Sequence, residues 1–298
     1  MPSLGVLRVL IREVLTAERA ARIPEPELVM DGPEQVAAYT RAGREGGSLS
    51  PLYLFQSSQV SRVIRPGETV LDLACGPANQ LAQVARLNPG VHFVGVDLSE
   101  HMLEQARALA AQQRLANVEF HRADICDLRA FPDASADAVM STLSFHHLPD
   151  ASHLDACFRE AARVLKPGGG IYFADLGHLR SEASITHFAN QYAARQPAVF
   201  TLDYLNSLRA AFSLEDFRRA ASAFGGRARV LSTFLVPYMI VVRSEDRRAP
   251  DRALGERLRA MEQALEPTYR KDLRDLRQFF RLGGLDCPYL EPERGPAR

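Results

Sequence analysis

Three aspartates at or near the ends of short predicted strands could together bind a nucleoside. Asp97 follows one apolar run, and a carboxylate at that position can accept both hydrogen bonds from a ribose diol. Asp124 follows the next predicted strand, where it can accept a hydrogen bond from an adenine amino group. Asp72 lies inside the apolar run 69–73, where it would repel a phosphate but favour a ligand with a positive ammonium group. The three acids therefore favour an adenosine with a cationic tail that lacks phosphate.

The turn that follows Asp72 supports the same ligand. A strand that runs through a glycine-containing turn into a helix is where α/β sheets hold nucleotides. Dinucleotide-binding turns need three glycines so that the backbone can approach a pyrophosphate, and here Gly76 is the only one. S-adenosylmethionine (SAM), with S-adenosylhomocysteine as its product, is the adenosine derivative that fits these residues. We expect NAD not to bind.

Catalytic residues are expected in the two loops that follow the fourth and fifth predicted strands. His146 and His147 lie in the first loop, and Asp175 and His178 in the second. If SAM gives its methyl group to a hydroxyl of a second molecule, the acceptor, a neutral imidazole can remove the hydroxyl proton. For an acceptor that is already ionised, alignment alone suffices. Because the two histidines are adjacent, we expect only one of them to face the acceptor, and His146 is preferred.

A metal site formed by the same histidines is not expected. His146, His147, Asp150 and His153 have spacings that could hold an ion. A turn at Pro149 followed by the start of a helix explains this spacing without a metal.

The elements that must position these residues alternate between strands and helices. The sequence predicts strands at 69–73, 93–96, 118–123, 138–140 and 171–174, and helices after Ala78, after Ser99 as N-cap, and from 151 to a stop at 166–169. Two further apolar runs, at 229–234 and 238–242, are close enough to pair antiparallel. The fold class is therefore α/β: a doubly wound, mostly parallel, seven-stranded Rossmann-like sheet.

Three segments are expected along the chain. Residues 1–66 would form an N-terminal helical segment or lid, 67–244 the SAM-binding core with a helical insert at 179–224, and 245–298 a charged helical tail. The insert is rich in aromatic residues and is placed to cover the acceptor. The apolar stripes of the tail would pack either on the sheet of the same chain or on a second copy, giving a homodimer.

Composition and charge limit the kinds of partner and the cellular environment that we expect for this chain. The chain of 298 residues has 36 basic and 36 acidic side chains, so an overall basic field that would favour nucleic acid is absent. Its four cysteines are far apart, which is typical of reduced thiols in a cytoplasmic protein. No apolar run reaches the length of a membrane span. Leu4, Leu7, Ile11 and Leu15 have helical spacing, and we expect this helix to pack on the body rather than lie on a membrane.

Taken in order, these motifs resemble those of the class I SAM-dependent methyltransferases, in particular the small-molecule branch that includes quinone and sterol methyltransferases. The resemblance covers about 110 residues. It is carried by Asp72–Ala78, Val96–Ser99, Ala123–Ile125, Asp137–Ser141 with Phe145–Leu148, and Arg163–Gly169. One departure is Ala78, where the family usually has glycine, and a Cβ there is unfavourable if φ is positive.

The resemblance implies a role for each matching position. The backbone at Ala74 and Gly76 would hold the methionine end of SAM, with Asp72 organising the loop. The remaining cofactor contacts would come from Asp97 on the ribose, Leu98 and Met102 on the adenine faces, Asp124 and Ile125 on the adenine edge, and Ser141 near the methyl group. For the aspartates, the alternative is that each caps local backbone at a strand end.

The leading functional hypothesis is methyl transfer from SAM to a small, partly apolar acceptor. A peptide or protein acceptor is the first alternative, because the charged tail offers a docking surface. The second is a non-catalytic protein with a SAM fold that uses the tail for regulation or assembly.

Overall fold

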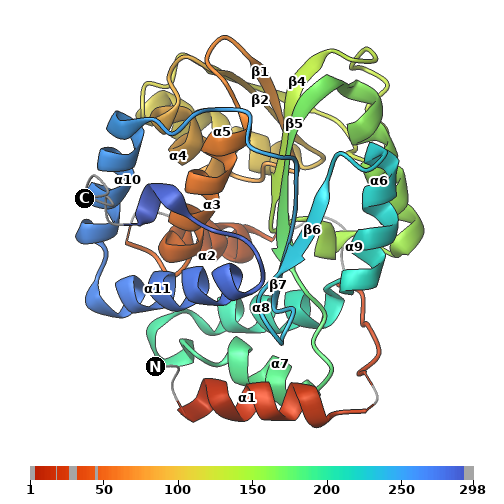
Figure 1. Ribbon diagram of the computed structural model, residues 1–298, viewed down its shortest axis with the longest axis vertical. Coiled ribbons are helices and arrows are strands. Elements are labelled where there is room, and N and C mark those ends of the chain that lie inside the picture. The colour runs from red at the N-terminus through yellow and green to blue at the C-terminus, as the bar shows by residue number, and fades with distance from the viewer. Residues whose placement is uncertain (1–3, 18, 27–31, 44–45, 292–298) are drawn as a thin grey trace, which may run out of the picture.

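A seven-stranded sheet forms the centre of the molecule, as the sequence predicts (Figure 1). The computed structural model describes residues 4–17, 19–26, 32–43 and 46–291. The strand order is β3-β2-β1-β4-β5-β7-β6; β7 runs antiparallel to both neighbours and the other pairs from β3 to β5 are parallel. The strands are β1 (Thr69–Leu73), β2 (His92–Asp97), β3 (Val118–Arg122), β4 (Ala136–Thr142), β5 (Leu165–Leu176), β6 (Arg229–Ser232) and β7 (Met239–Arg243).

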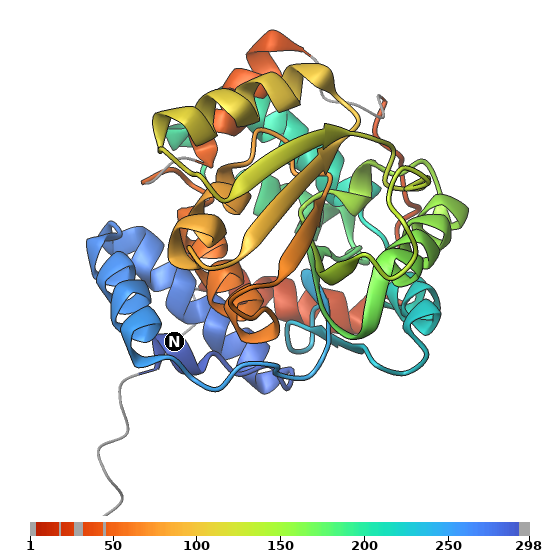
Figure 2. The same cartoon turned by 90° about the horizontal axis from the view of Figure 1, so that it is seen from above.

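Helices cover both faces of this sheet (Figure 2). Side chains alternate between the faces along a strand, so Val70 and Tyr172 belong to one hydrophobic core while Leu71 and Phe173 belong to the other. The first core includes residues of α3 (Ser50–Val63), α4 (Asn79–Leu87) and α5 (Glu100–Gln112), and the second includes residues of α6 (Ala151–Val164) and α9 (Leu214–Ala221). Burial on both faces explains why the central strands are almost wholly apolar.

The helix starts that matter for the site are capped by side chains. The Ser99 hydroxyl accepts a hydrogen bond from the backbone N–H of Met102, which confirms the expected N-cap of α5. Asp150 caps α6 by accepting from the backbone N–H groups of Ser152 and His153. The far end of α6 differs from expectation: the helix ends at Val164, and 166–169 already belong to β5. Pro167 cannot continue a helix, and Gly168 takes a positive φ of 73° in an irregular part of that strand.

In the expected helical insert, α7 (Glu182–Ala189) and α8 (Ala198–Ala210) lie beyond the carboxyl end of β5, and α9 packs beside α6 on one face of the sheet. The N-terminal helix α1 (Leu4–Leu15) packs against α7. It does so through a different stripe from the one expected: Val9 and Glu13 are buried, whereas Ile11 and Leu15 are exposed. The buried Glu13 carboxylate accepts hydrogen bonds from the backbone N–H groups of Arg180 and Ser181, so a polar contact orients this helix. The side chains of Leu4 and Leu7 lie outside the described part of the structure.

The helical tail packs on its own chain. The helices α10 (Arg252–Ala264) and α11 (Pro267–Leu282) lie against α3, and their stripe residues Leu254, Leu258, Leu273 and Phe280 are fully buried. The rings of Phe280 and Phe55 stack with centroids 4.8 Å apart. This apolar stripe is therefore covered within one copy, and a homodimer through the tail would need other residues of these helices.

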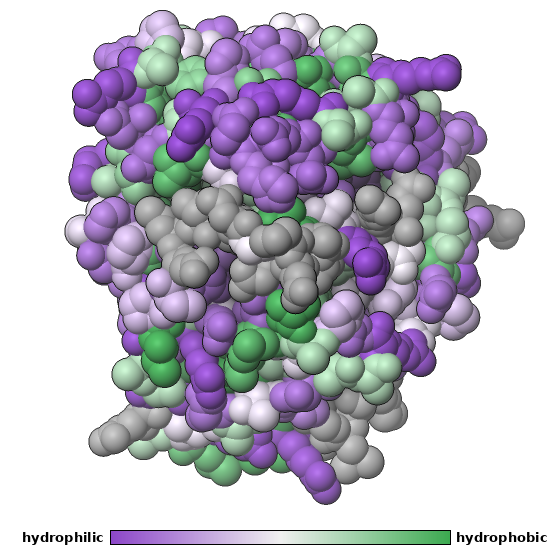
Figure 3. All heavy atoms as spheres, turned by 180° about the vertical axis from the view of Figure 1, so that it is seen from behind, coloured by the Kyte–Doolittle hydropathy of each residue, from purple (hydrophilic) through white to green (hydrophobic). Residues whose placement is uncertain are grey.

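The face in Figure 3 is mostly hydrophilic, with small separated hydrophobic patches, as is ordinary for a globular chain. Within the described residues, no helix is both long enough and apolar enough to cross a membrane.

The packing of the tail predicts the effect of a single substitution. Phe280→Ala removes a fully buried ring from the contact with α3, so the free energy of unfolding should fall by about 3–5 kcal/mol. Leu282→Ala, on the same helix but 54% exposed, should change it by no more than about 0.5 kcal/mol. Urea unfolding of both variants measures this. Equal, small effects would show that the tail does not contribute to the stability of the core.

Candidate active site

Two neighbouring cavities lie at the carboxyl edge of the parallel strands. The first, which we call the loop cavity, has a volume of about 130 Å³ and is formed by the loops after β1, β2, β3 and β4. Most of the residues expected to contact the cofactor line it: Ala74, Gly76, Asp97, Leu98, Met102, Asp124 and Ile125. The structure thus brings together positions that are up to 51 residues apart in the sequence.

The turn after β1 has an unusual backbone. Ala74, Gly76 and Ala78 all have positive φ, at 55°, 53° and 62°. Ala74 and Ala78 carry a Cβ, which disfavours this conformation. Ala78 therefore adopts the positive φ at which its Cβ was expected to be unfavourable. At Gly76 an added Cβ would meet no atom within 4 Å, and this residue lines the loop cavity. The turn therefore leaves open space beside its backbone for a ligand.

Asp97 and Asp124 both cap local backbone and line the loop cavity. The Asp97 carboxylate accepts from the backbone N–H of Gly76 at 2.8 Å and of Ser99 at 2.9 Å. Burial raises the pKa of Asp97 despite these hydrogen bonds. Asp124 accepts from the backbone N–H of Cys126 at 2.8 Å. A carboxylate has about four lone-pair sites, so capping and ligand binding are compatible.

Two residues expected at the cofactor lie behind the wall of the loop cavity. Asp72 is buried in β1, and its Oδ1 atom has no hydrogen-bond partner. Burial, together with the negative charge of Asp97, raises the pKa of Asp72 well above its ordinary value. Ser141 is fully buried, and its hydroxyl donates to the Leu73 carbonyl at 2.6 Å. The expected place of Ser141 on the cavity wall is taken by Ser144, which lies 2.6 Å from it.

The second cavity, the aromatic cavity, has a volume of about 250 Å³. The insert contributes Phe188, Tyr192, Phe200 and Tyr204 to its wall, which are the aromatic residues expected to surround an acceptor. Residues of α1, α3, the β6–β7 loop and α11 also line it. Tyr39, Leu143 and His147 line both cavities and therefore mark the place where the two meet.

Both histidines of the loop after β4 line the aromatic cavity, whereas we expected only one of them to face the acceptor. The loop forms a short 3-10 turn over Phe145–His147, and the two rings lie 4.4 Å apart between centroids. His146 is buried, and its Nδ1 lies 2.7 Å from Oδ1 of Asp175. His147 is less buried and also reaches the loop cavity.

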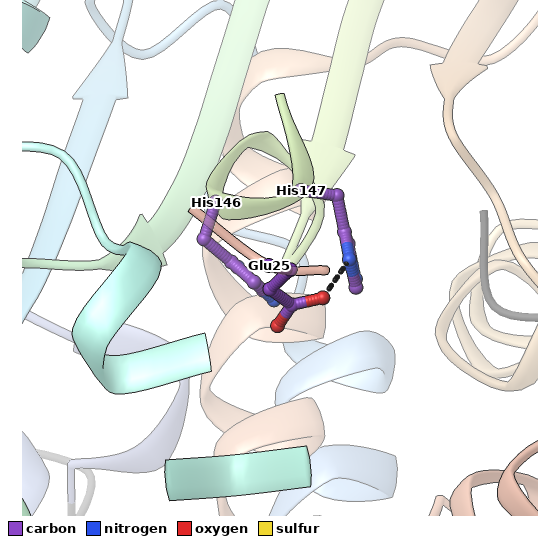
Figure 4. Close-up of side chains that lie close together, drawn as sticks. All are labelled: Glu25, His146 and His147. Carbon is purple, nitrogen blue, oxygen red and sulfur yellow. Dashed lines mark ion pairs between the residues drawn. The ribbon is translucent and has the colours of Figure 1, made fainter. Parts of the chain in front are cut away.

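A glutamate that sequence reasoning missed completes this group. Glu25 lies beside both histidines, and its Oε2 is 2.5 Å from Nδ1 of His147 (Figure 4). Ser207 in α8 donates a hydrogen bond to Oε1 of Glu25 at 2.7 Å. Burial would raise the pKa of Glu25, but the contact with His147 and the charge of His146 lower it to about 2. Burial would likewise lower the pKa of His146, but the charge of Asp175 raises it.

The remaining polar candidates have structural contacts. Asp175 is fully buried and positions His146 by accepting from its ring and from its backbone N–H. The Nε2 atom of His178 lies 2.7 Å from the carbonyl of Ala20, and His178 lines neither cavity. Burial lowers the pKa of His178. His153 lies 2.9 Å from Asp150 at the start of α6 and lines the loop cavity.

Comparison with known proteins identifies the central part of the chain. Residues 70–169 match a family model described as a methyltransferase domain. This is a class I SAM-dependent methyltransferase domain.

Relatives and solved structures resemble this methyltransferase domain to different extents. The chain is 36% identical over 123 residues to 27-O-demethylrifamycin SV methyltransferase of Amycolatopsis mediterranei, covering 41% of this chain and 43% of that protein. It is 35% identical over 113 residues to a demethylmenaquinone methyltransferase of Listeria monocytogenes, covering 38% and 46%. Each match thus spans less than half of the relative's length. A crystal structure of a SAM-dependent methyltransferase from Aquifex aeolicus shares the fold, with a TM-score of 0.51 and 19% identity over 72% of this chain and 98% of that one.

Arg22 holds the segment that carries Glu25 against the methyltransferase domain. Its guanidinium donates to the carbonyls of Leu148 and Pro149 at 2.6 Å and of Ala210 at 2.7 Å. It also lies 3.9 Å from the centroid of the Phe212 ring. No sequence pattern indicated this role, because the segment has no regular secondary structure and its partners, which include the carbonyl of His146, are 124 to 190 residues away.

The contacts of Arg22 predict a stabilising role. Arg22→Met keeps the aliphatic stem but loses the charged donors, so the free energy of unfolding should fall by about 1.5–3 kcal/mol. Arg19→Met is a matched control in the same segment, because Arg19 makes only a 3.8 Å pair with the exposed Glu215 and should matter by no more than about 0.5 kcal/mol. Urea denaturation compares the two. A neutral Arg22→Met would mean that the segment is not anchored by this side chain.

Proposed function

We propose that the whole protein is a SAM-dependent methyltransferase that methylates a small, partly apolar acceptor. The observation that supports this most is the pair of cavities that meet at Tyr39, Leu143 and His147. One cavity carries two of the three acids expected for an adenosine ligand, Asp97 and Asp124, and the other carries aromatic side chains expected for an apolar acceptor. The names of the two relatives describe methylation of a rifamycin and of a demethylmenaquinone, which supports the same class of acceptor.

The residues of the loop cavity fit SAM. The buried Oδ1 of Asp72 lacks a donor, and a cationic ammonium group held by the following turn would offset the cost of that buried charge. Asp97 would accept the ribose hydroxyls, Leu98 and Met102 would contact the adenine faces, and Asp124 and Ile125 its edge. When bound, SAM supplies an electrophilic methyl group: a bond forms from the acceptor to this carbon, and the carbon–sulfur bond breaks with its electron pair staying on sulfur.

The chain's own residues would align the acceptor and handle its proton. The aromatic wall excludes water and holds an apolar body, so that the reacting oxygen or other nucleophile points toward the junction of the cavities. The imidazoles of His146 and His147 lie at this junction or beside it. If the nucleophile is a hydroxyl, they are the groups placed to accept its proton.

Incubation with methyl-labelled SAM and a cell extract tests the proposal. Label in a small-molecule fraction supports it. Label in protein alone would favour a peptide or protein acceptor instead, and no label in any product would favour a regulatory or assembly role.

The contacts of Asp97 predict its effect on cofactor affinity. Asp97→Ala should weaken SAM binding by about 1.5–3 kcal/mol, the usual scale for losing hydrogen bonds to a charged group. Asp137→Ala is the matched control, since Asp137 lies at the amino end of β4, where its carboxylate accepts from the backbone N–H of Thr69. Titration calorimetry should find SAM affinity unchanged in that control and no measurable NAD binding in the wild type. Unchanged affinity in Asp97→Ala would mean that the ribose is held elsewhere.

The two histidines predict a separation of binding from turnover. If the acceptor is a hydroxyl, His146→Ala should lower turnover by roughly 10²–10⁴-fold with little change in SAM affinity, because His146 lines only the aromatic cavity. His147→Ala should lower turnover and also alter SAM affinity, because His147 lines both cavities. Steady-state rates across pH, with calorimetry for SAM, distinguish these outcomes. Full activity in both variants would restrict the mechanism to alignment without these side chains.

A further inference from the structure

Glu25, His146 and His147 form a compact cluster, and its two histidines line the aromatic cavity (Figure 4). One potential ligand atom from each residue lies within 4.8 Å of those of the other two. Glu25 comes from the N-terminal segment and the histidines from the loop after β4, so the cluster exists only in the folded chain. We call it the Glu25–His146–His147 cluster.

The donor types in this cluster suit a transition metal. Two imidazoles and one carboxylate are a common ligand set for divalent first-row ions, and three protein ligands leave coordination positions for other molecules. Both histidines line the aromatic cavity, so the open positions of such an ion would face the space assigned to the acceptor.

Outer contacts orient the ligands as metal sites require. Asp175 lies 2.7 Å from Nδ1 of His146, which leaves Nε2 of that ring for the cluster. Metal-binding histidines commonly hold a carboxylate on the second nitrogen in this way. Ser207 donates to one oxygen of Glu25, and Arg22 donates to the carbonyl of Leu148 just beyond the histidines. The cluster is therefore held from both segments.

The contact between Glu25 and His147 also points to a third partner. Their Oε2 and Nδ1 atoms are 2.5 Å apart, yet the buried Nδ1 makes no hydrogen bond of normal geometry. A buried ring nitrogen without a well-directed hydrogen bond can serve as a metal ligand. Bound to one ion, it and Oε2 of Glu25 would lie about 3 Å apart rather than 2.5 Å.

We propose that Glu25, His146 and His147 bind a divalent transition-metal ion such as Zn²⁺ or Fe²⁺, whose open positions take oxygen atoms of the acceptor. This assigns the acceptor to molecules with a hydroxyl or carbonyl oxygen on an apolar body. Coordination lowers the pKa of a bound hydroxyl, which would release its proton to solvent and bind the ion in its ionised form, so that no free imidazole is needed as the base. The role in methyl transfer rests on the proposed function, whereas ion binding does not.

Titration of the chelator-treated full chain with Co²⁺ tests the site by visible absorption. One equivalent should bind and be displaced by Zn²⁺. Glu25→Gln, which keeps an oxygen for Ser207, and His147→Ala should each weaken Co²⁺ binding by about 100-fold or more. Asp175→Asn should weaken it by about 10–100-fold, as expected for a residue that positions a ligand. Circular dichroism and thermal unfolding identify any variant that fails to fold. The proposal requires that at least one of the three variants is folded and binds Co²⁺ weakly.

A second histidine–glutamate group provides the control. On the exposed surface, His92 and His121 lie 3.4 and 3.5 Å from Glu119. His92→Ala should leave the Co²⁺ absorption unchanged. The proposal is overturned if the wild type shows no Co²⁺ absorption, if a folded Glu25→Gln keeps it in full, or if His92→Ala abolishes it.

An activity measurement separates the two proposals. Loss of label transfer after chelation, with recovery on adding Zn²⁺ or Fe²⁺, supports the role of the ion in the reaction. Label transfer that persists in the chelator-treated chain would contradict that role while leaving the methyltransferase proposal intact. Co²⁺ binding without any label transfer would contradict the methyltransferase proposal while leaving the proposed ion site intact.

Discussion

The buried carboxylate of Asp175 is the constraint on which the site depends. A charge in a dry interior is costly unless hydrogen bonds surround it, and Asp175 is fully buried at the end of β5. Its oxygens accept from the ring and backbone N–H of His146 and from the backbone N–H of Leu176. These contacts hold the loop after β4 against β5. The placement of both histidines, and hence the contact with Glu25, follows from satisfying this one group.

The parts of the fold that repeat a local pattern could be predicted from the sequence. The run 69–73 is apolar and β-branched, and Ser99 precedes a helix with apolar spacing, so strand, turn and cap each have a local physical cause. Parallel strands place their carboxyl ends at one edge of the sheet, and for this reason the sequence alone predicts Asp97 and Asp124 at a common cavity.

What could not be predicted depends on contacts between distant segments. Glu25 and Arg22 lie in a segment with no periodic pattern, and only the folded chain brings them to the loop after β4. The inward position of Ser141 depends on which side of β4 faces Leu73, a matter of strand register. The packing partner of the tail could not be predicted for the same reason, because its apolar stripe fits any apolar surface. The folded chain identifies this partner as α3, where Phe280 stacks on Phe55.

The wall of the aromatic cavity has a consequence for how this protein can diversify. Phe188 and Tyr204 from the insert, together with residues of α1 and α11, lie outside the matched region 70–169, whereas most of the loop cavity lies within it. Under the proposed function, substitutions in these outer segments would change acceptor choice while the sheet and its cofactor loops stay the same. Proteins that descend from one ancestral domain could therefore acquire new acceptors through changes in segments that a comparison over residues 70–169 does not include.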